Sequence, residues 1–407
     1  MTTTSTPTNT TLPPTIPPAP ANLPHMDQTH ANDRSPRLEP AADANGATNS
    51  TDALITTFGS VRVAHPLPAH DADDHDHDDD HSDDEHEYHD DDATTTAVGA
   101  EEIVDESVFL ADVPDDCPEL DLTHCRLRDM AALGLSRLTQ LERLGMRQNL
   151  FAHIEGIDGL AGNLRELDLY DNRIAKIHAL AVFEKLETLD LSFNKIKRIP
   201  KGVFDKLNNL TDLYFVANKI STIEHLDGLT SLRNLELGAN RIRTIENLDH
   251  LTNLTQLWLG KNKITSLAGL ASLQNLTLLS IQSNRIVDLA GLENLPNLEE
   301  LYMSHNGVLE LEHLENNTKL RVLDVCNNRI SKLENIAHLI HLEELWISYN
   351  HLDDWDAVEA QTKDLAKLET IYLEGNPLQK SAGASYRTRV KVLIPWIKQI
   401  DATFVRN

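Results

Sequence analysis

The stretch Leu232-Arg233-Asn234-Leu235-Glu236-Leu237-Gly238-Ala239-Asn240-Arg241-Ile242 has the pattern L-x-x-L-x-L-x-x-N-x-I, and this pattern recurs along most of the chain. The asparagines that close its copies follow one another at intervals of 23, 22, 24, 22, 22, 22, 22, 22, 22 and 26 residues. They are Asn149, Asn172, Asn194, Asn218, Asn240, Asn262, Asn284, Asn306, Asn328, Asn350 and Asn376. A sustained period of this length is typical of a repeat architecture.

Each position of the pattern has a physical reason. One repeat of this size cannot bury its own apolar face, so positions such as Leu235, Leu237 and Ile242 must point inward and pack on neighbouring repeats. The asparagine amide offers donors and an acceptor to backbone groups that would otherwise be buried without partners. We therefore expect an α/β solenoid: a leucine-rich repeat array of about twelve mostly 22-residue repeats, with a parallel sheet on the concave face.

The charge of the chain is concentrated before the array. Residues 1–119 contain 27 acidic residues and 3 arginines, a net charge of −24, whereas the remaining 37 acids and 33 bases leave −4. A nearly neutral array excludes a nucleic-acid scaffold and a basic membrane-surface protein. The three cysteines form no flanking cluster, and no apolar run approaches the ~20 residues of a bilayer span. We expect a reducing compartment, no signal peptide and no cofactor.

Four segments are predicted from the changes in composition and periodicity. Large apolar residues are too few in the first segment to offset the entropy of the chain, so disorder is expected there. The segments are a disordered tail over 1–92, Thr/Pro-rich and then acidic and His/Asp-rich; a lead-in over 93–119; the repeats over 120–378; and a C-terminal helical cap over 379–407.

The tail contains a His/Asp-rich tract, with histidines at His75, His77, His81, His86 and His89. Imidazoles and carboxylates ligate zinc, nickel or copper. A defined site also needs fixed geometry and supporting contacts, which a low-complexity segment lacks. We therefore expect a solvated acidic tail and assign no metal site.

Departures from the repeat pattern have local explanations. Cys125 takes the asparagine position of the first repeat, where a buried thiol is expected. A two-residue insertion places Phe204 on the convex side of the core, and four extra residues around Trp355 predict a short helix with Trp355 in the core. From Tyr386 to Ile394 the apolar spacing is that of a one-sided helix covering the open end.

Function is expected on the outward strand positions, because alternation sends positions three, five and seven of each repeat away from the core. Position five reads Asp121, Gly145, Asp168, Asp190, Tyr214, Glu236, Trp258, Ser280, Tyr302, Asp324, Trp346 and Tyr372. Five of these twelve residues are aromatic, against 5% of the chain, and none is Lys or Arg. Position three adds Glu166, Asp212, Glu300 and Glu344.

Two explanations of this column compete. Large residues raise strand propensity, but that would equally favour Val, Ile and Thr, and none of these occurs in the column. Trp and Tyr beside carboxylates are typical of a protein-binding surface, and they favour a basic, partly apolar partner. An enzyme is not indicated, because Gly-rich phosphate loops, H-E-x-x-H and G-x-S-x-G are absent and an open sheet lacks an enclosed pocket.

Several segments together resemble one family, protein phosphatase 1 regulatory subunit 7, the sds-twenty-two class of leucine-rich repeat proteins. The likeness runs from about Glu119 to the C-terminus, and its most specific part is the closing Q-I-D-A-T-F-V-R. The segments are Leu167–Ile174, Leu257–Thr265, Tyr302–Gly307, Gly375–Gln379 and Gln399–Arg406.

The resemblance implies a non-catalytic regulator of the type-1 serine/threonine phosphatase catalytic subunit, found in nucleus and cytoplasm and acting in the cell cycle and chromosome segregation. It leaves open whether phosphatase inhibitor three joins in a ternary complex, and it implies no nucleic-acid or membrane partner. The positions implied in phosphatase binding are Asp190, Tyr214, Glu236, Trp258, Asp324, Glu344, Trp346 and Tyr372, to which the column itself adds Tyr302.

Two rival functions remain at this stage. A leucine-rich repeat adaptor for a different protein complex would use the same face with another partner. The second rival function is metal storage or delivery through the tail histidines. Deleting residues 1–92 separates metal storage from the two binding functions.

Overall fold

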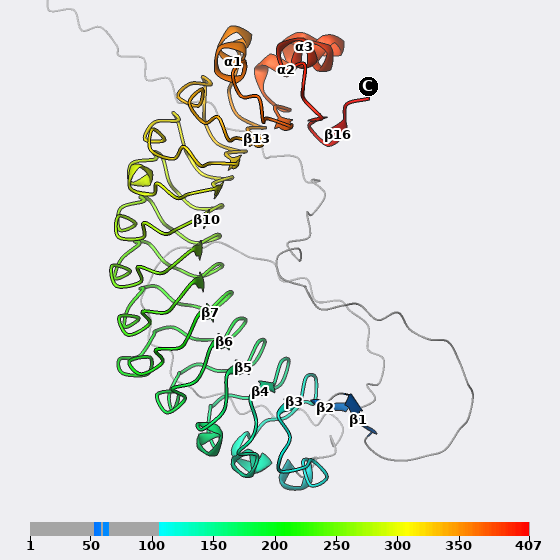
Figure 1. Cartoon of the computed structure of the whole chain (residues 1–407), viewed down its shortest axis with the longest axis vertical. Coiled ribbons are helices and arrows are strands. Elements are labelled where there is room, and N and C mark those ends of the chain that lie inside the picture. Colours follow the sequence, from blue (N-terminus) through cyan, green and yellow to red (C-terminus); the bar gives the residue numbers. More distant parts are fainter. Residues whose placement is uncertain (1–52, 58–59, 65–105, 407) are drawn as a thin grey trace, which may run out of the picture. The chain divides into compact units, whose positions relative to one another are not determined.

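The computed structural model describes residues 53–57, 60–64 and 106–406 of the 407-residue chain. From residue 106 onward the chain winds into a curved solenoid (Figure 1). The strands lie along its inner side, and the segments that connect them form the outer side. The predicted α/β solenoid is confirmed.

Each repeat contributes one three-residue strand. In the described part of the chain, twelve such strands pair in parallel and in sequence order, as predicted. Their register sets each central leucine, or Ile371 in the last strand, beside the next, for example Leu235 beside Leu257. The strands are β3 Glu119–Asp121, β4 Arg143–Gly145, β5 Glu166–Asp168, β6 Thr188–Asp190, β7 Asp212–Tyr214, β8 Asn234–Glu236, β9 Gln256–Trp258, β10 Leu278–Ser280, β11 Glu300–Tyr302, β12 Val322–Asp324, β13 Glu344–Trp346 and β14 Thr370–Tyr372.

Two hairpins extend this sheet. At one end β1 (Ala53–Thr57) and β2 (Ser60–Ala64) pair antiparallel, and β2 pairs with β3 in parallel. At the other end β15 (Gln399–Ile400) pairs with β14 and with β16 (Thr403–Phe404). The first hairpin differs from the disorder expected over 1–92, because β-branched residues are frequent in these short runs. The rest of that segment, the His/Asp tract included, lies outside the described residues.

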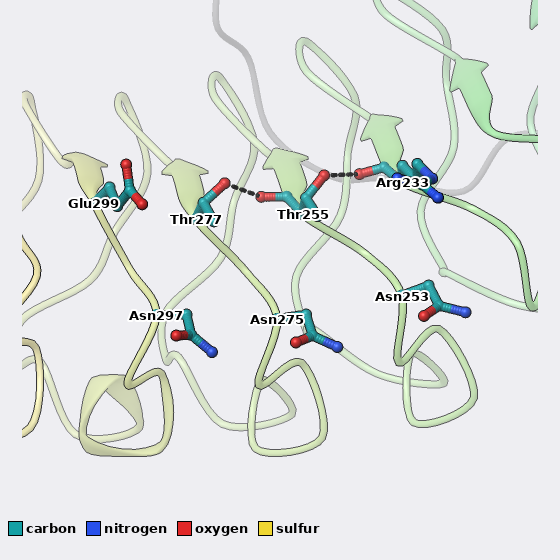
Figure 2. A pocket seen from close by; sticks show the side chains of 7 residues that line it. All are labelled: Arg233, Asn253, Thr255, Asn275, Thr277, Asn297 and Glu299. Atoms are coloured by element: carbon teal, nitrogen blue, oxygen red, sulfur yellow. Dashed lines mark hydrogen bonds between the residues drawn. The ribbon is translucent and has the colours of Figure 1, made fainter.

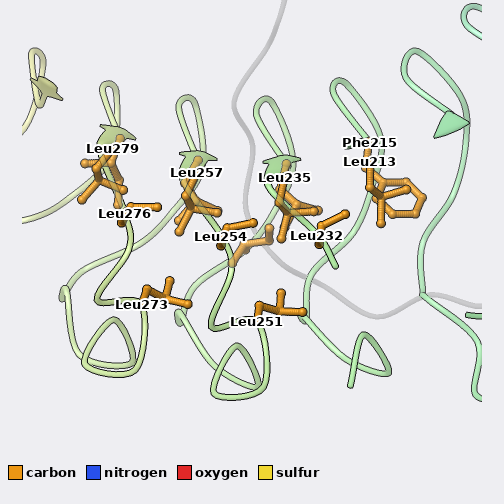
Figure 3. Packing of buried hydrophobic residues seen from close by; sticks show 14 of the residues in the cluster. Leu213, Phe215, Leu232, Leu235, Leu251, Leu254, Leu257, Leu273, Leu276 and Leu279 are labelled. Atoms are coloured by element: carbon orange, nitrogen blue, oxygen red, sulfur yellow. The ribbon is translucent and has the colours of Figure 1, made fainter. Parts of the chain in front are cut away.

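The core is a continuous stack of leucine layers (Figure 3). Leu232, Leu235 and Leu237 are all fully buried, and the equivalent leucines of the next repeat pack beside them. Burying one leucine side chain contributes roughly 1.5–3 kcal/mol, but only if neighbouring repeats cover it. The core therefore depends on stacking rather than on any single repeat.

The closing asparagines form an inner ladder along the solenoid. The amide oxygen of Asn240 accepts from the Ile220 N–H at 3.0 Å. Its Nδ2 group donates to the carbonyls of Phe215 at 2.8 Å, Leu237 at 3.0 Å and Gly238 at 3.1 Å. The side chain thus satisfies backbone groups in two successive repeats, as the sequence predicts.

Helices occur mainly near the C-terminal end. They are α1 Trp355–Thr362, α2 Pro377–Ala382 and α3 Tyr386–Leu393, with 3-10 turns η1 Glu106–Val108, η2 Ala131–Leu133, η3 Leu135–Arg137, η4 Asp158–Leu160, η5 Leu292–Asn294 and η6 Gly383–Ser385. Trp355 is buried in α1 and Phe204 in the convex side of the core, as predicted. None of the helices in the described residues has the length and apolar character needed to cross a membrane.

In the C-terminal cap, the carboxylate of Asp401 takes the place of a backbone carbonyl: in earlier repeats the matching N–H groups, such as that of Ile347, donate to the carbonyl of the next strand. Oδ1 of Asp401 accepts from the N–H groups of Leu373 at 2.9 Å and Glu374 at 3.1 Å. The hydroxyl of Tyr386, on α3, donates to the same oxygen at 3.2 Å. Tyr386 and Val390 are buried against the last leucine layer, so the predicted cap helix is confirmed. The bond between Tyr386 and Asp401 ties this helix to the closing hairpin.

Candidate functional site

The position-five side chains form one row along the concave sheet. Each closes a strand, and the register pairs neighbours directly, Glu236 with Trp258 and Trp258 with Ser280. The predicted residues in this row are Asp190, Tyr214, Glu236, Trp258, Tyr302, Asp324, Trp346 and Tyr372, and Glu344 opens β13 beside it. The fold therefore brings all nine predicted positions onto one face.

Large and small side chains alternate in the second half of this row. Ser280 lies between Trp258 and Tyr302, and Asp324 lies between Tyr302 and Trp346. Both smaller side chains are buried: Ser280 is only 2% exposed and Asp324 only 7%. Asp324 was expected to face a partner, but in the free chain it is already buried, and its Oδ1 accepts from the Cys326 N–H at 3.0 Å.

An aromatic group occupies the C-terminal half of the face. The ring centroids of Tyr302 and Trp346 lie 6.4 Å apart in an edge-to-face arrangement, and those of Trp346 and Tyr372 lie 5.6 Å apart. Each of the three side chains is half-buried. Offset and edge-to-face pairs contribute about 0.5–1.5 kcal/mol beyond burial, so the group is a preorganised apolar surface.

Polar side chains fix the orientation of these rings. The hydroxyl of Tyr302 donates to Oε2 of Glu300 at 2.9 Å, and the indole N–H of Trp346 donates to Oε2 of Glu344 at 3.1 Å. Gln399 donates to the hydroxyl of Tyr372 at 2.9 Å, which ties the last aromatic to the closing hairpin. Glu344 thus holds Trp346 in place, in addition to the partner contact predicted from its position.

An acidic group occupies the N-terminal half and includes a counter-ion that the sequence reasoning missed. The guanidinium of Arg147 pairs with Asp168, and its Nη2 lies 3.9 Å from Oδ2 of Asp190. It also lies over the ring of Tyr170, 5.3 Å from the centroid, and the ring of Tyr170 packs at a tilt of 44° against that of Phe193, with centroids 4.8 Å apart. Arg147 and Tyr170 occupy position seven, so extending the outward column by one step would have found both.

Burial changes the protonation of the acidic group. Desolvation raises the pKa of Asp190, and it raises the pKa of Glu236 to about 7, with the nearby Asp190 charge adding to the shift. Desolvation also raises the pKa of Tyr214 to about 12. A cation placed against Glu236 would favour its ionised form. This half of the face therefore gains from a basic partner.

A shallow groove of about 330 Å³ lies away from this row, on the flank where the chain enters the strands (Figure 2). Asn253, Asn275 and Asn297 line it, and each donates its amide to a backbone carbonyl of the preceding repeat, at 2.8 to 2.9 Å. Thr255 and Thr277 donate in the same way, each at 3.0 Å. The groove is the surface of a second structural ladder, in which each amide already donates one hydrogen bond to the backbone.

Comparison with known families identifies the repeats. The leucine-rich repeat family matches residues 162–220 and 184–242. A second family, of paired leucine-rich repeats, matches residues 230–272, 274–316 and 318–360. Both matches fall within the solenoid.

Curated relatives match over shorter stretches. The chain is 42% identical over 99 residues to the protein phosphatase 1 regulatory subunit SDS22 of Saccharomyces cerevisiae, which covers 24% of this chain and 29% of the relative. It is 39% identical over 128 residues to the protein phosphatase 1 regulatory inhibitor subunit PPP1R7 homolog of Arabidopsis thaliana, covering 30% and 38%. It is 47% identical over 55 residues to the human protein phosphatase 1 regulatory subunit 7, covering 14% of each chain. The matched stretches span well under two thirds of these relatives.

Solved structures agree on the fold. An internalin, InlF of Listeria monocytogenes, superposes with a TM-score of 0.60 at 24% identity, covering 69% of this chain and 80% of the internalin. The Leptospira interrogans leucine-rich repeat protein LIC12759 superposes with a TM-score of 0.57 at 23% identity, covering 70% and 84%. At these identities the likeness concerns the solenoid alone.

Proposed function

Since the chain belongs to the leucine-rich repeat proteins of the SDS22 class, we propose that it is a non-catalytic regulatory subunit that binds the type-1 serine/threonine phosphatase catalytic subunit. The binding surface is the concave row from Asp190 to Tyr372, with Glu344 beside it. The observation that carries the proposal is the register, which places five aromatic residues and three carboxylates of this stretch in a single line.

The two halves of the row ask for different features in the partner. The acidic half around Asp190 and Glu236 fits a basic surface, and the desolvated Glu236 carboxyl gains from a cation. The half formed by Tyr302, Trp346 and Tyr372 fits an apolar protrusion. Interface energy concentrates in such buried aromatic anchors, each of which is worth roughly 2 kcal/mol or more.

The finer parts of the proposal follow from the same premise. Occupying the phosphatase through this face controls its activity or its maturation. The complex acts in the nucleus and the cytoplasm, in the cell cycle and chromosome segregation, and phosphatase inhibitor three is a candidate third component. An adaptor for another protein complex would use the same face and is the rival that the test below addresses.

The test is a calorimetric titration of the full chain with the type-1 catalytic subunit, using Trp346→Ala and the matched variant Trp396→Ala. Trp396 is 37% exposed on the C-terminal cap, away from the concave row. We expect binding at about −8 kcal/mol or tighter, weakened at least about tenfold by Trp346→Ala and unchanged by Trp396→Ala. Absence of binding by the unmodified chain would favour the rival adaptor.

A further inference from the structure

Two neighbouring repeats bring two imidazoles and a carboxylate together on the surface. His153 and Glu155 flank Ile154, which is fully buried, so both side chains leave the backbone on the solvent side. In the next repeat Ile177, 3% exposed, holds the equivalent core position and His178 follows it. Stacking of Ile154 and Ile177 therefore fixes the backbone that carries all three polar side chains.

The ligating atoms of these three side chains lie close enough to share one ion. All of them lie within 4.8 Å of one another, and Nε2 of His178 is 3.9 Å from Oε1 of Glu155. The rings of His153 and His178 are tilted by 49°, with centroids 6.1 Å apart, so they are not stacked face to face. Bonds of about 2.0–2.1 Å in a tetrahedral site leave ligand atoms about 3.3 Å apart, so exposed side chains need to move inward only by about 1 Å.

We propose that His153, Glu155 and His178 form a binding site for a divalent transition-metal ion, Zn²⁺ or a chemically similar ion, that links two neighbouring repeats. Neutral imidazole suits zinc, copper and nickel, whereas magnesium and calcium require oxygen ligands. Three protein ligands leave a fourth position for water. The ion joins the segment that follows Asn149 to the segment that follows Asn172.

Comparison with other repeats supports a specific rather than a general feature. In the repeats closed by Asn218 and Asn240, the three equivalent positions hold Thr222, Glu224 and Glu246. These offer carboxylates and a hydroxyl but no imidazole. Within the described residues, the group formed by His153, Glu155 and His178 is the one in which at least three such side chains converge.

The site is separate from the proposed phosphatase-binding row. His153 and Glu155 lie in the segment that follows Asn149, whereas the concave row uses the last residues of the strands, such as Gly145 in this repeat. Metal binding is therefore expected to stabilise the N-terminal part of the solenoid without changing affinity for the partner. Failure of the phosphatase proposal leaves this inference standing.

The test is a titration of the full chain with ZnCl₂, in a parent variant in which the five histidines of the His/Asp-rich tract, His75, His77, His81, His86 and His89, are replaced by Asn. That replacement removes the competing imidazoles of the tract. We expect one Zn²⁺ per chain, and His153→Ala and His178→Ala each weaken binding at least about tenfold. MgCl₂ gives no binding at this site.

A matched control separates a three-ligand site from an ordinary His–Glu pair. Nδ1 of His313 lies 3.9 Å from Oε2 of Glu293, but His313 belongs to no converging group of three ligands within the described residues. His313→Ala is expected to bind Zn²⁺ like the parent, and Zn²⁺ is expected to raise the melting temperature of the parent but not that of His178→Ala. Equal zinc affinity in His153→Ala, His178→Ala and the parent, or no binding by the parent, overturns the proposal.

Discussion

Replacing Asn262 by Ala removes one rung of the inner ladder and is expected to destabilise the solenoid strongly. Its amide oxygen accepts from the Ile242 N–H at 3.0 Å. Its Nδ2 group donates to the carbonyls of Leu237 at 2.9 Å, Leu259 at 3.0 Å and Gly260 at 3.3 Å. Alanine leaves these groups without that partner, and most of them are buried, where water cannot replace it.

The size of the effect follows from these four bonds. Each intramolecular hydrogen bond contributes about 0.5–1.5 kcal/mol net, and a buried donor left unpaired costs about 1–3 kcal/mol. We expect Asn262→Ala to lower the free energy of unfolding by about 3–5 kcal/mol. That is a large fraction of the roughly 5–15 kcal/mol typical of a folded protein.

Asn253→Ala is the matched control. Asn253 belongs to the outer ladder, is exposed, and donates one bond, to the Thr230 carbonyl at 2.8 Å. We expect a loss below about 1 kcal/mol. The assay is guanidinium-induced unfolding followed by circular dichroism, with amide hydrogen exchange at Ile242 as a local readout, since repeat arrays do not always unfold in two states. Losses that agree within 1 kcal/mol for the two variants would refute the assignment of the ladders.

Three further perturbations test other parts of the account. Because the pKa of Glu236 is raised to about 7, the folded chain binds a proton more tightly than the unfolded chain. The contribution of this proton to stability is therefore lost as pH rises from about 4.5 to 7. Glu236→Gln should then unfold at higher denaturant concentration than the parent at pH 8 but not at pH 4. The gain is expected near 1 kcal/mol, below the roughly 3 kcal/mol given by the shift alone, because solvent reaches part of the side chain. Asp401→Ala leaves two backbone N–H groups and the Tyr386 hydroxyl without their acceptor. Thermal unfolding should show that the free energy of unfolding falls by about 2–4 kcal/mol, and an unchanged melting temperature would contradict the capping role. Gly269→Ala places a Cβ 2.1 Å from the Ile245 carbonyl oxygen at a φ of +98°. We expect chemical unfolding to show a free energy of unfolding lower by about 2 kcal/mol or more, whereas an unchanged value would show that the turn relaxes.

Much of the fold follows from the period of the sequence. A leucine at positions such as 235 and 237 can be buried only by stacking, so spacing alone predicts the parallel sheet, its order and its outward row. The same reasoning places Trp355 and Phe204 in the core, because insertions in a stacked repeat must still cover it. The predicted row is confirmed as a geometric feature, and its role in binding stays a prediction.

Other features depend on contacts that spacing does not contain. Arg147 reaches across two strands to Asp168 and Asp190, which requires knowing where a long side chain points. Asp324 is buried although it holds an outward position of its strand, and its Oδ1 accepts from the Cys326 N–H. The hairpin β15–β16 is too short to have a recognisable strand pattern. Its Asp401 nevertheless accepts hydrogen bonds from the last strand of the repeats and so joins the hairpin to the array.

The most direct test of the central claim is hydroxyl-radical footprinting of the full chain with and without the type-1 phosphatase catalytic subunit. Trp258, Tyr302, Trp346 and Tyr372 report on the concave row, while Trp396 and Val392, 37% and 71% exposed on the C-terminal cap, serve as internal controls. The account predicts that the four concave side chains become protected in the complex and that the two controls stay reactive. A complex that protects the controls and leaves the concave row unchanged, or the absence of any complex, would contradict it.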